Sequence, residues 1–402
     1  MSDNPITFLC LASEHKGDAF VHELKRQGAR VFLVTEEKWR EKPWPRDSLD
    51  DIFFVPDMSK NEDVMKGVAY LARGRWLDRV VALDDYDVRL AAMLREHMRL
   101  PGMNSSTARY FRDKLAMRQG AAQAGIDVPP FVGVLNHQQI NDYMAQLPAP
   151  WMLKPRFEAG AVGIKKAHAP QEAWDWINEL GDQQSYYLLE QFIPGDVYHV
   201  DAIVWEGEMI FAAAHKYGRP PMNVSHEGGV FITRTLDHDG PEATELKALN
   251  QTLLRALGME QGVAHTEYIR SHADGRFYFL ETASRVGGAH IAETVEAATG
   301  INLWAEWARL EYAHAQRAAY QLPPHRHEYA GILICLARQE WPDLTAYHDP
   351  EVVWRVNKPW HAGLIIASPD AGRIEELINS YSHRFAHDFL AVAKPKEAQR
   401  MG

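Results

Sequence analysis

A β-hairpin is predicted by residues 262–290, which read GVAHTEYIRSHADGRFYFLETASRVGGAH. Two apolar strand patterns flank a polar turn in this segment. If residues 273–275 form a three-residue loop that ends on a left-handed glycine, Glu267 and Glu281 lie directly opposite each other. Opposed carboxylates on one face of a hairpin repel unless a cation lies between them, so this register predicts a divalent metal site. A two-residue turn at 274–275 is the alternative, and it would put the glutamates on opposite faces.

The second strand leads into a turn that suits an anion. Residues 281–290 pass from the strand through Gly287 and Gly288 to a predicted helix, with Arg285 just before the glycines. Free backbone N–H groups at a helix start, together with an arginine, favour phosphoryl oxygens next to carboxylate-held Mg²⁺. A purely structural turn is the alternative.

A second candidate phosphate contact lies upstream. Residues 151–155 predict an apolar strand that carries one charge, Lys154, and the small-residue loop 159–163 follows it with Gly160 and Gly163. Small residues permit close approach to phosphate, and a half-buried lysine supplies a point charge. The loop does not have the G-x-x-x-x-G-K-[ST] spacing of a Walker-type site.

Residues 188–195, LLEQFIPG, predict an apolar strand that runs into a Pro-Gly turn. Backbone groups exposed at such a strand end can read the edge of an adenine. Glu190 is alternatively a charge on an edge strand.

A polar segment rich in Gly and Pro, residues 215–229, is long enough to be a substrate loop. An ordinary surface connection is the alternative. The candidate substrate contacts in it are Lys216, Arg219, His226, Gly228 and Gly229.

The first hundred residues alternate strand and helix patterns. Apolar runs at 6–11 and 30–34 flank an amphipathic segment at 19–27, and the alternation continues with 80–83 and 88–98. This order predicts a doubly wound parallel sheet. Its first turn lacks the G-x-G-x-x-G spacing, which argues against a dinucleotide site.

The chain has 402 residues, too many for one compact core. Residues that break helices and strands, at Leu100-Pro101-Gly102 and Pro323-Pro324, predict domain boundaries. We expect an N-terminal parallel-sheet α/β domain at 1–100, an antiparallel-rich α+β domain at 101–322, and a small C-terminal α+β subdomain at 323–402 with a solvated tail at 394–402.

Composition excludes several classes of function. The formal net charge of -11 argues against general binding to nucleic acid or to an anionic membrane surface. Cys10 and Cys335 each lie in an apolar run, which fits a reducing cytoplasm. No signal peptide or membrane-spanning pattern is present in the sequence, so we expect a cytoplasmic protein with small-molecule partners.

Taken in order, these motifs resemble the ATP-grasp superfamily of carboxylate–amine ligases, and among them the L-amino-acid ligases that make dipeptides. The resemblance spans about residues 83–311. A helix is expected over 107–124. The resemblance rests on Asp113-Lys114 before a helix, Lys154-Pro155, the small-residue loop, the segment 189–195, Glu267, and Glu281-x-x-x-Arg285.

The resemblance implies an ATP-grasp fold for the middle domain and a role for each motif. Lys114 and Lys154 would contact ATP phosphates, and Glu267 and Glu281 would bind Mg²⁺ or Mn²⁺. Arg285, with Gly287 and Gly288, would hold the transferring phosphoryl group. The adenine region would be formed by Glu190, Gln191, Phe192 and Ile193.

Two departures from the family pattern stand out. The usual Glu-x-Asn places a third metal ligand two residues after the second glutamate, where this chain has Ala283. The usual ribose-binding glutamate after Gly195 is missing, and Asp196 or His199 is the candidate replacement.

The implied activity is an ATP-dependent ligase that forms an amide through an acyl-phosphate and releases ADP and phosphate. The alternatives are a purine-biosynthetic or biotin-carboxylase-like enzyme and, from another class, a nucleotide-binding scaffold. A homodimer is compatible with the sequence.

Overall fold

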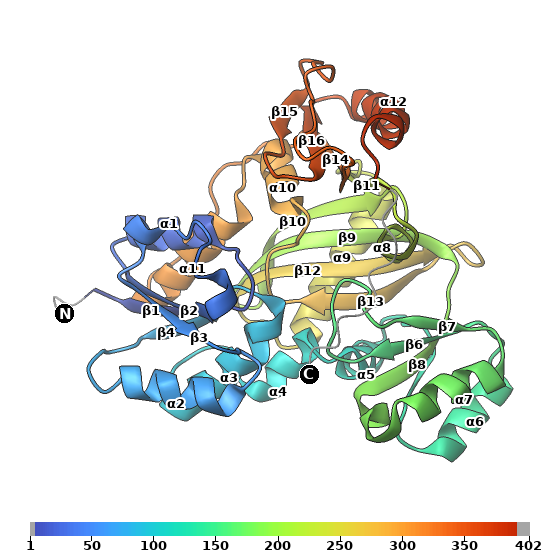
Figure 1. The fold of residues 1–402 in the computed structure, drawn as a ribbon, viewed down its shortest axis with the longest axis horizontal. Coiled ribbons are helices and arrows are strands. Elements are labelled where there is room, and N and C mark those ends of the chain that lie inside the picture. Colours follow the sequence, from blue (N-terminus) through green and yellow to red (C-terminus); the bar gives the residue numbers. More distant parts are fainter. Residues whose placement is uncertain (1–4, 392–402) are drawn as a thin grey trace.

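The computed structural model describes residues 5–391, and the N-terminal part of this region contains a parallel sheet in the order β3-β2-β1-β4. The strands are β1 (Thr7–Ala12), β2 (Arg30–Glu36), β3 (Asp51–Val55) and β4 (Arg79–Ala82), and the helices are α1 (Asp18–Arg26), α2 (Asn61–Leu71) and α3 (Val88–Met98). Helix α1 packs on one face together with α11 (Leu303–Gln316), whereas α2 and α3 cover the other (Figure 1). The expected parallel sheet is confirmed.

A large antiparallel sheet forms the centre of the molecule, in the order β13-β12-β9-β10-β11-β14-β16-β15. Its strands are β9 (Gly195–Trp205), β10 (Glu208–Tyr217), β11 (Phe231–Thr235), β12 (Gly262–Ser271), β13 (Phe277–Ala283), β14 (Tyr329–Leu336), β15 (Val352–Arg355) and β16 (His361–Ser368). The strands expected after residue 323 therefore join the same sheet, because β14 pairs with β11.

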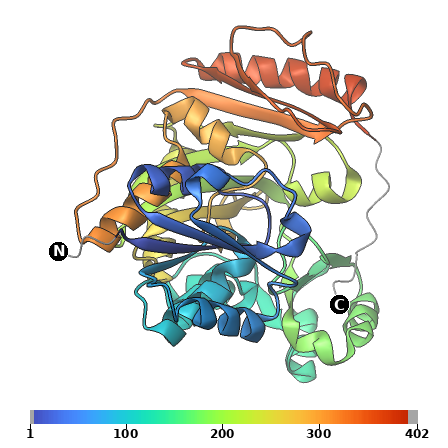
Figure 2. The same cartoon turned by 60° about the vertical axis from the view of Figure 1, so that its left-hand side comes forward.

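Three helices cover this sheet. Helix α9 (Pro241–Ala256) packs on one face of β9, β10 and β12, and α10 (Ile291–Thr299) packs against β14 and β16. Helix α12 (Ala371–Asp388) packs on the other face of β14 and β16 (Figure 2).

A second antiparallel sheet, β5-β8-β6-β7, forms the smaller lobe (Figure 1). It consists of β5 (Phe131–Gly133), β6 (Trp151–Pro155), β7 (Lys165–Ala167) and β8 (Tyr187–Gln191), and helices α6 (His137–Gln146) and α7 (Pro170–Glu179) pack against it. Helix α5 (Lys114–Gln123) contacts both β8 and β13. The two antiparallel sheets therefore approach each other across α5.

The single helix expected over residues 107–124 is wrong. A short helix, α4 (Ser105–Ala108), continues as a 3-10 turn over Arg109–Phe111, the helix breaks at Arg112 and Asp113, and α5 begins at Lys114. The side chain of Asp113 caps the first turn of α5 and also accepts from Nε of Arg156 at 2.8 Å. Because Arg156 comes from the loop after β6, the break depends on a tertiary contact.

No helix within residues 5–391 combines the length and apolar character needed to cross a membrane. The tail expected to be solvated, residues 394–402, lies outside the described residues.

Candidate active site

The hairpin of β12 and β13 places Glu267 directly opposite Glu281, so the predicted pairing is confirmed. The predicted turn is wrong. A backbone hydrogen bond of 3.0 Å from Ser271 to Arg276 closes a four-residue loop, 272–275. A bulge next to Glu267 adds one residue to β13 and restores the register that brings the glutamates together.

The two carboxylates are held by different donors. Tyr217 donates from its hydroxyl to Oε1 of Glu267 at 2.8 Å, and Lys114 donates from Nζ to Oε2 of Glu281 at 2.8 Å. Burial raises the pKa of Glu281, but the Lys114 ammonium more than offsets this and holds the pKa below its ordinary value. Oε2 of Glu267 and Oε1 of Glu281 accept no hydrogen bond from residues 5–391. Two glutamates with free oxygens on one face of the sheet fit a hard divalent cation.

Two lysines lie beside this pair, and both are largely buried. Lys114 begins α5, and its Nζ also donates to the backbone oxygen of Glu158 at 2.6 Å. Lys154 lies in β6, where its ammonium pairs with Glu190. The side chains of Lys114 and Lys154 are 10% and 14% exposed. Each predicted lysine is therefore paired with a carboxylate, and the charge of Lys154 also helps to lower the pKa of Glu281.

The Glu190 carboxylate is buried between two cations. Arg118, one turn after Lys114, donates to Oε2 of Glu190 from Nε at 3.0 Å and from Nη2 at 2.8 Å, and its Nη1 donates to the backbone of Leu280. Burial raises the pKa of Glu190, but Arg118 and Lys154 together lower it below its ordinary value. The Glu190 side chain is thus committed to these partners rather than free for an adenine, which corrects the expectation. Sequence reasoning missed Arg118, because no local pattern separates a buried arginine from an exposed one.

The segment expected to read an adenine has one free backbone donor. Gln191 and Phe192 donate their backbone N–H groups to Pro130 and Pro150 at 2.9 and 3.0 Å. The N–H of Ile193, just after β8, donates to no residue in the described part of the chain.

The turn after β13 holds Arg285 next to a buried glycine. The Nη1 of Arg285 donates to a neighbouring backbone oxygen at 2.8 Å, and its Nε is buried with no partner among residues 5–391. A Cβ on Gly287 would lie 2.9 Å from Oδ1 of Asp201 and 3.0 Å from Nδ1 of His265, so no side chain fits there. Gly288 faces open space. Helix α10 follows the turn, as predicted.

The two predicted loops touch each other. In the loop after β6, Gly160 and Gly163 have φ of +66° and +71°, a left-handed conformation that favours glycine. The segment after β10 forms a short helix, α8 (Pro221–Glu227), and Nε2 of His226 lies 3.1 Å from the backbone oxygen of Ala161.

The remaining candidate residues of the substrate loop determine the conformation of the loop itself. Arg219 pairs with Glu227 at 2.5 Å. Gly228 and Gly229 follow α8 with φ of +78° and +143°, which turns the chain into β11.

Three expected contacts, Lys216, Asp196 and His199, present no free group to the glutamates. Lys216 and Asp196 form an ion pair of 2.7 Å, and the alternation of side chains along β9 and β10 puts both on the opposite face of the sheet from Glu267. His199 shares the face of Glu267, but it is fully buried and both ring nitrogens are bonded to neighbouring side chains. The ribose assignments to Asp196 and His199 are therefore corrected, because neither presents a free group on the side where the glutamates meet.

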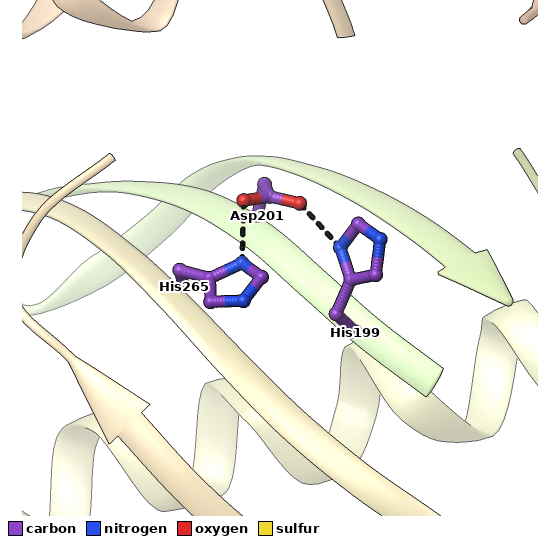
Figure 3. A group of neighbouring side chains, drawn as sticks. All are labelled: His199, Asp201 and His265. Atoms are coloured by element: carbon purple, nitrogen blue, oxygen red, sulfur yellow. Dashed lines mark hydrogen bonds and ion pairs between the residues drawn. The ribbon is translucent and has the colours of Figure 1, made fainter. Parts of the chain in front are cut away.

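A buried polar cluster that the sequence did not predict lies beside Glu267. Asp201 accepts from Nδ1 of His199 at 2.7 Å and from Nδ1 of His265 at 2.9 Å (Figure 3). Burial lowers the pKa of His265, but Asp201 and Glu267 more than offset this and raise it to about 9. Burial is the dominant effect on His199, whose pKa is lowered.

No known family model matches the sequence. The L-arginine-specific L-amino acid ligase of Bacillus subtilis is 26% identical over 263 residues, which cover 63% of this chain and 62% of that protein. Carnosine synthase 1 of Gallus gallus is 25% identical over 359 residues, which cover 80% of this chain and 36% of that protein. The match thus spans less than two thirds of the length of either relative.

Solved structures agree with the fold over nearly the whole chain. The L-amino acid ligase from Bacillus licheniformis superposes with a TM-score of 0.77 at 18% identity, covering 98% of this chain and 100% of that one. The N5-carboxyaminoimidazole synthetase from Staphylococcus aureus complexed with ADP superposes with a TM-score of 0.69 at 12% identity, covering 94% and 98%. The resemblance read from the motifs is therefore confirmed: this chain has the ATP-grasp fold and resembles the L-amino-acid ligases among the carboxylate–amine ligases.

Proposed function

We propose that the protein is an ATP-dependent ligase that joins the carboxylate of one amino acid to the amine of another through an acyl-phosphate. The observation that carries this proposal is the contact of Lys114 with Glu281, which lies directly opposite Glu267, together with the charge of Lys154 acting on Glu281. Arg285 follows in the turn after the strand of Glu281. This set combines cationic groups for phosphates with carboxylates for a cation.

The chain's own residues supply binding and charge. Glu267 and Glu281 would hold a divalent cation, Mg²⁺ or Mn²⁺, which supplies positive charge to the β- and γ-phosphate oxygens. Lys114 and Lys154 would exchange their present carboxylate partners for phosphate oxygens. The free N–H of Ile193 would donate to the adenine edge.

Arg285 would hold the transferring group, since its buried Nε has no partner in the described chain. One oxygen of the substrate carboxylate attacks the γ-phosphorus, the bond to the bridging oxygen breaks, and ADP leaves with the electron pair. The amine then attacks the acyl carbon, phosphate leaves with the electrons of the C–O bond, and the nitrogen loses a proton.

The two touching loops would exclude water from the acyl-phosphate. Helix α8 and the loop after β6 meet at His226 and Ala161, and this loop follows directly after the strand that carries Lys154. Water would otherwise hydrolyse the intermediate before the amine arrives.

We further propose the division into domains at 1–100, 101–322 and 323–402, supported by the separate parallel sheet of the first; the strands β14–β16 of the third extend the central sheet of the second. The two free, buried cysteines support a cytoplasmic location.

ADP formation across amino acids, supplied singly and in pairs, tests the proposal. We expect ADP release that requires two amino acids and a product mass equal to their sum minus water. Release that depends on bicarbonate instead would favour a carboxylase-like enzyme, and nucleotide binding without any release would favour a scaffold.

A further inference from the structure

The proposed function leaves a fully buried carboxylate without a role. Asp201 in β9 has both oxygens engaged by imidazoles, His265 at 2.9 Å and His199 at 2.7 Å (Figure 3). The far nitrogen of His199 is in turn 2.7 Å from Oγ1 of Thr233. A third imidazole, His215, stacks on His199 with Nδ1 3.9 Å from Oδ2 of Asp201, and neither of its ring nitrogens has a hydrogen-bond partner within residues 5–391. The hydrogen bonds of Asp201 to His199 and His265 fix the arrangement of these three side chains.

The network leads to the candidate cation site. Nε2 of His265 lies 3.7 Å from Oε1 of Glu267, the same oxygen that accepts from Tyr217. Nδ1 of His265 is hydrogen-bonded to Asp201, and its Nε2 faces Glu267 at a distance beyond a hydrogen bond, so the ring is held by Asp201 and packs beside Oε1 of Glu267. These contacts hold Oε1 of Glu267 and leave its Oε2 free.

Ala283, which stands where the family pattern has asparagine, lies next to this network. Ala283 in β13 is the direct cross-strand partner of His265 in β12. A methyl group at this position leaves room for the imidazole beside Glu267. The hydrogen bond between His265 and Asp201 also lies directly under Gly287, in the turn that carries Arg285. One imidazole therefore contacts both the metal-binding strand and the phosphoryl-binding turn.

The three residues also have the ligand types of a transition-metal site. The contacts favour a hydrogen-bonded network over such a site. Each imidazole directs Nδ1 at its own oxygen of Asp201, and a metal bound through these nitrogens would require that their protons be lost.

We propose that His265, held by Asp201, is a positioning residue that fixes Glu267 with one oxygen free for the divalent cation and supports the Gly287 turn beside it. The proposal rests on the proposed function, because it assigns a purpose to the same site. The role of His265 is indirect, since it acts through Glu267 and the turn.

Mn²⁺ binding to the full-length protein with a non-hydrolysable ATP analogue tests this proposal, measured by the loss of the free Mn²⁺ signal in electron paramagnetic resonance. We expect His265→Ala to raise the Mn²⁺ dissociation constant by at least about tenfold, the usual effect of removing a group that orients a metal ligand. His265→Gln, whose amide still donates one hydrogen bond, should give a smaller loss and covers the case in which the alanine variant does not fold.

Tyr268→Phe is the matched control. Tyr268 is buried on the opposite face of the same strand and donates to Asn250 at 3.1 Å, so its removal destabilises β12 without touching Glu267. We expect a lower unfolding temperature for this variant with Mn²⁺ affinity within about twofold of the wild type.

Wild-type Mn²⁺ affinity in both folded His265 variants would overturn the proposal. So would a stoichiometric transition metal in the purified protein that is lost from His265→Ala, because the cluster would then be a metal centre. Failure of the wild type to bind the analogue or Mn²⁺ would overturn the proposed function itself, and the inference would fall with it.

Discussion

Lys154 has two possible roles in this structure, and its replacement by methionine separates them. Its ammonium pairs with Glu190. Lys154 is therefore either a structural counterion for that buried carboxylate or a phosphate ligand that pairs with Glu190 until ATP binds. Glu190 also has Arg118, which donates to it at 2.8 and 3.0 Å. Lys154→Met therefore leaves Glu190 paired, and we expect a loss of only about 1 kcal/mol in the free energy of unfolding.

Arg118→Met is the comparison. It removes two hydrogen bonds from Glu190 and one from Leu280, and breaking a buried ion pair by removing one partner costs about 3–5 kcal/mol. At about 2.1 cal/mol/K per residue, 402 residues give an unfolding entropy of about 0.84 kcal/mol/K, so the unfolding temperature should fall by about 4–6 °C.

Lys154→Met should bind ATP more weakly than its small loss of stability can explain. A charge-assisted contact to phosphate contributes about 1.5–3 kcal/mol, so ATP should bind about 10- to 150-fold more weakly. Thermal unfolding monitored by tryptophan fluorescence and calorimetric titration with ATP measure the two effects. If Lys154→Met unfolds as early as Arg118→Met and binds ATP with unchanged affinity, Lys154 is a structural counterion and the phosphate assignment is wrong.

Three further predictions concern chemistry, pH and the loops. Glu281→Gln should lower kcat by at least about 100-fold while weakening ATP binding much less, because the charge matters most as the phosphoryl group transfers; near-normal turnover at ordinary Mg²⁺ would contradict this. Burial, with the charge of Asp84, raises the pKa of Asp87 to about 7, so the native state keeps a proton that the unfolded chain releases near pH 4. Stability should then fall by on the order of 3 kcal/mol as the pH rises from about 4 to about 7, and Asp87→Asn should remove this fall; parallel unfolding profiles would refute it. Protease cleavage within α8 should slow when ATP and both substrates are present, because bound ligands would stabilise the contact between His226 and Ala161, and unchanged cleavage rates would count against a lid.

Sequence patterns located most of the strands because their apolar periodicity is local. The strand at 151–155 and the helix at 88–98 have the predicted ends, and the hairpin pairs Glu267 with Glu281. The pairing came from a loop length that the structure does not have, and the β-bulge compensated for the difference. Bulges depend on the neighbouring strands, so a sequence gives little warning of them.

What the sequence missed depends on contacts between distant segments. The break before α5 involves Asp113 and Arg156, 43 residues apart. The buried arginine at position 118 pairs with Glu190 across 72 residues, and no local pattern indicates that an arginine is buried. The ribose candidate His199 faces Asp201 because alternate residues of β9 lie on the same face of the sheet. A shift of one residue in the register of β9 would have put His199 on the other face.

The central claim is that a carboxylate is activated as an acyl-phosphate, and oxygen labelling tests it most directly. The carboxylate-donating amino acid of the best pair is labelled with ¹⁸O in both carboxyl oxygens, and the phosphate and nucleotide products are analysed by mass spectrometry. An acyl-phosphate route gives ADP together with phosphate that carries one ¹⁸O per product formed, because the attacking oxygen leaves with the phosphoryl group. AMP that carries the label, or phosphate without it, would contradict the account.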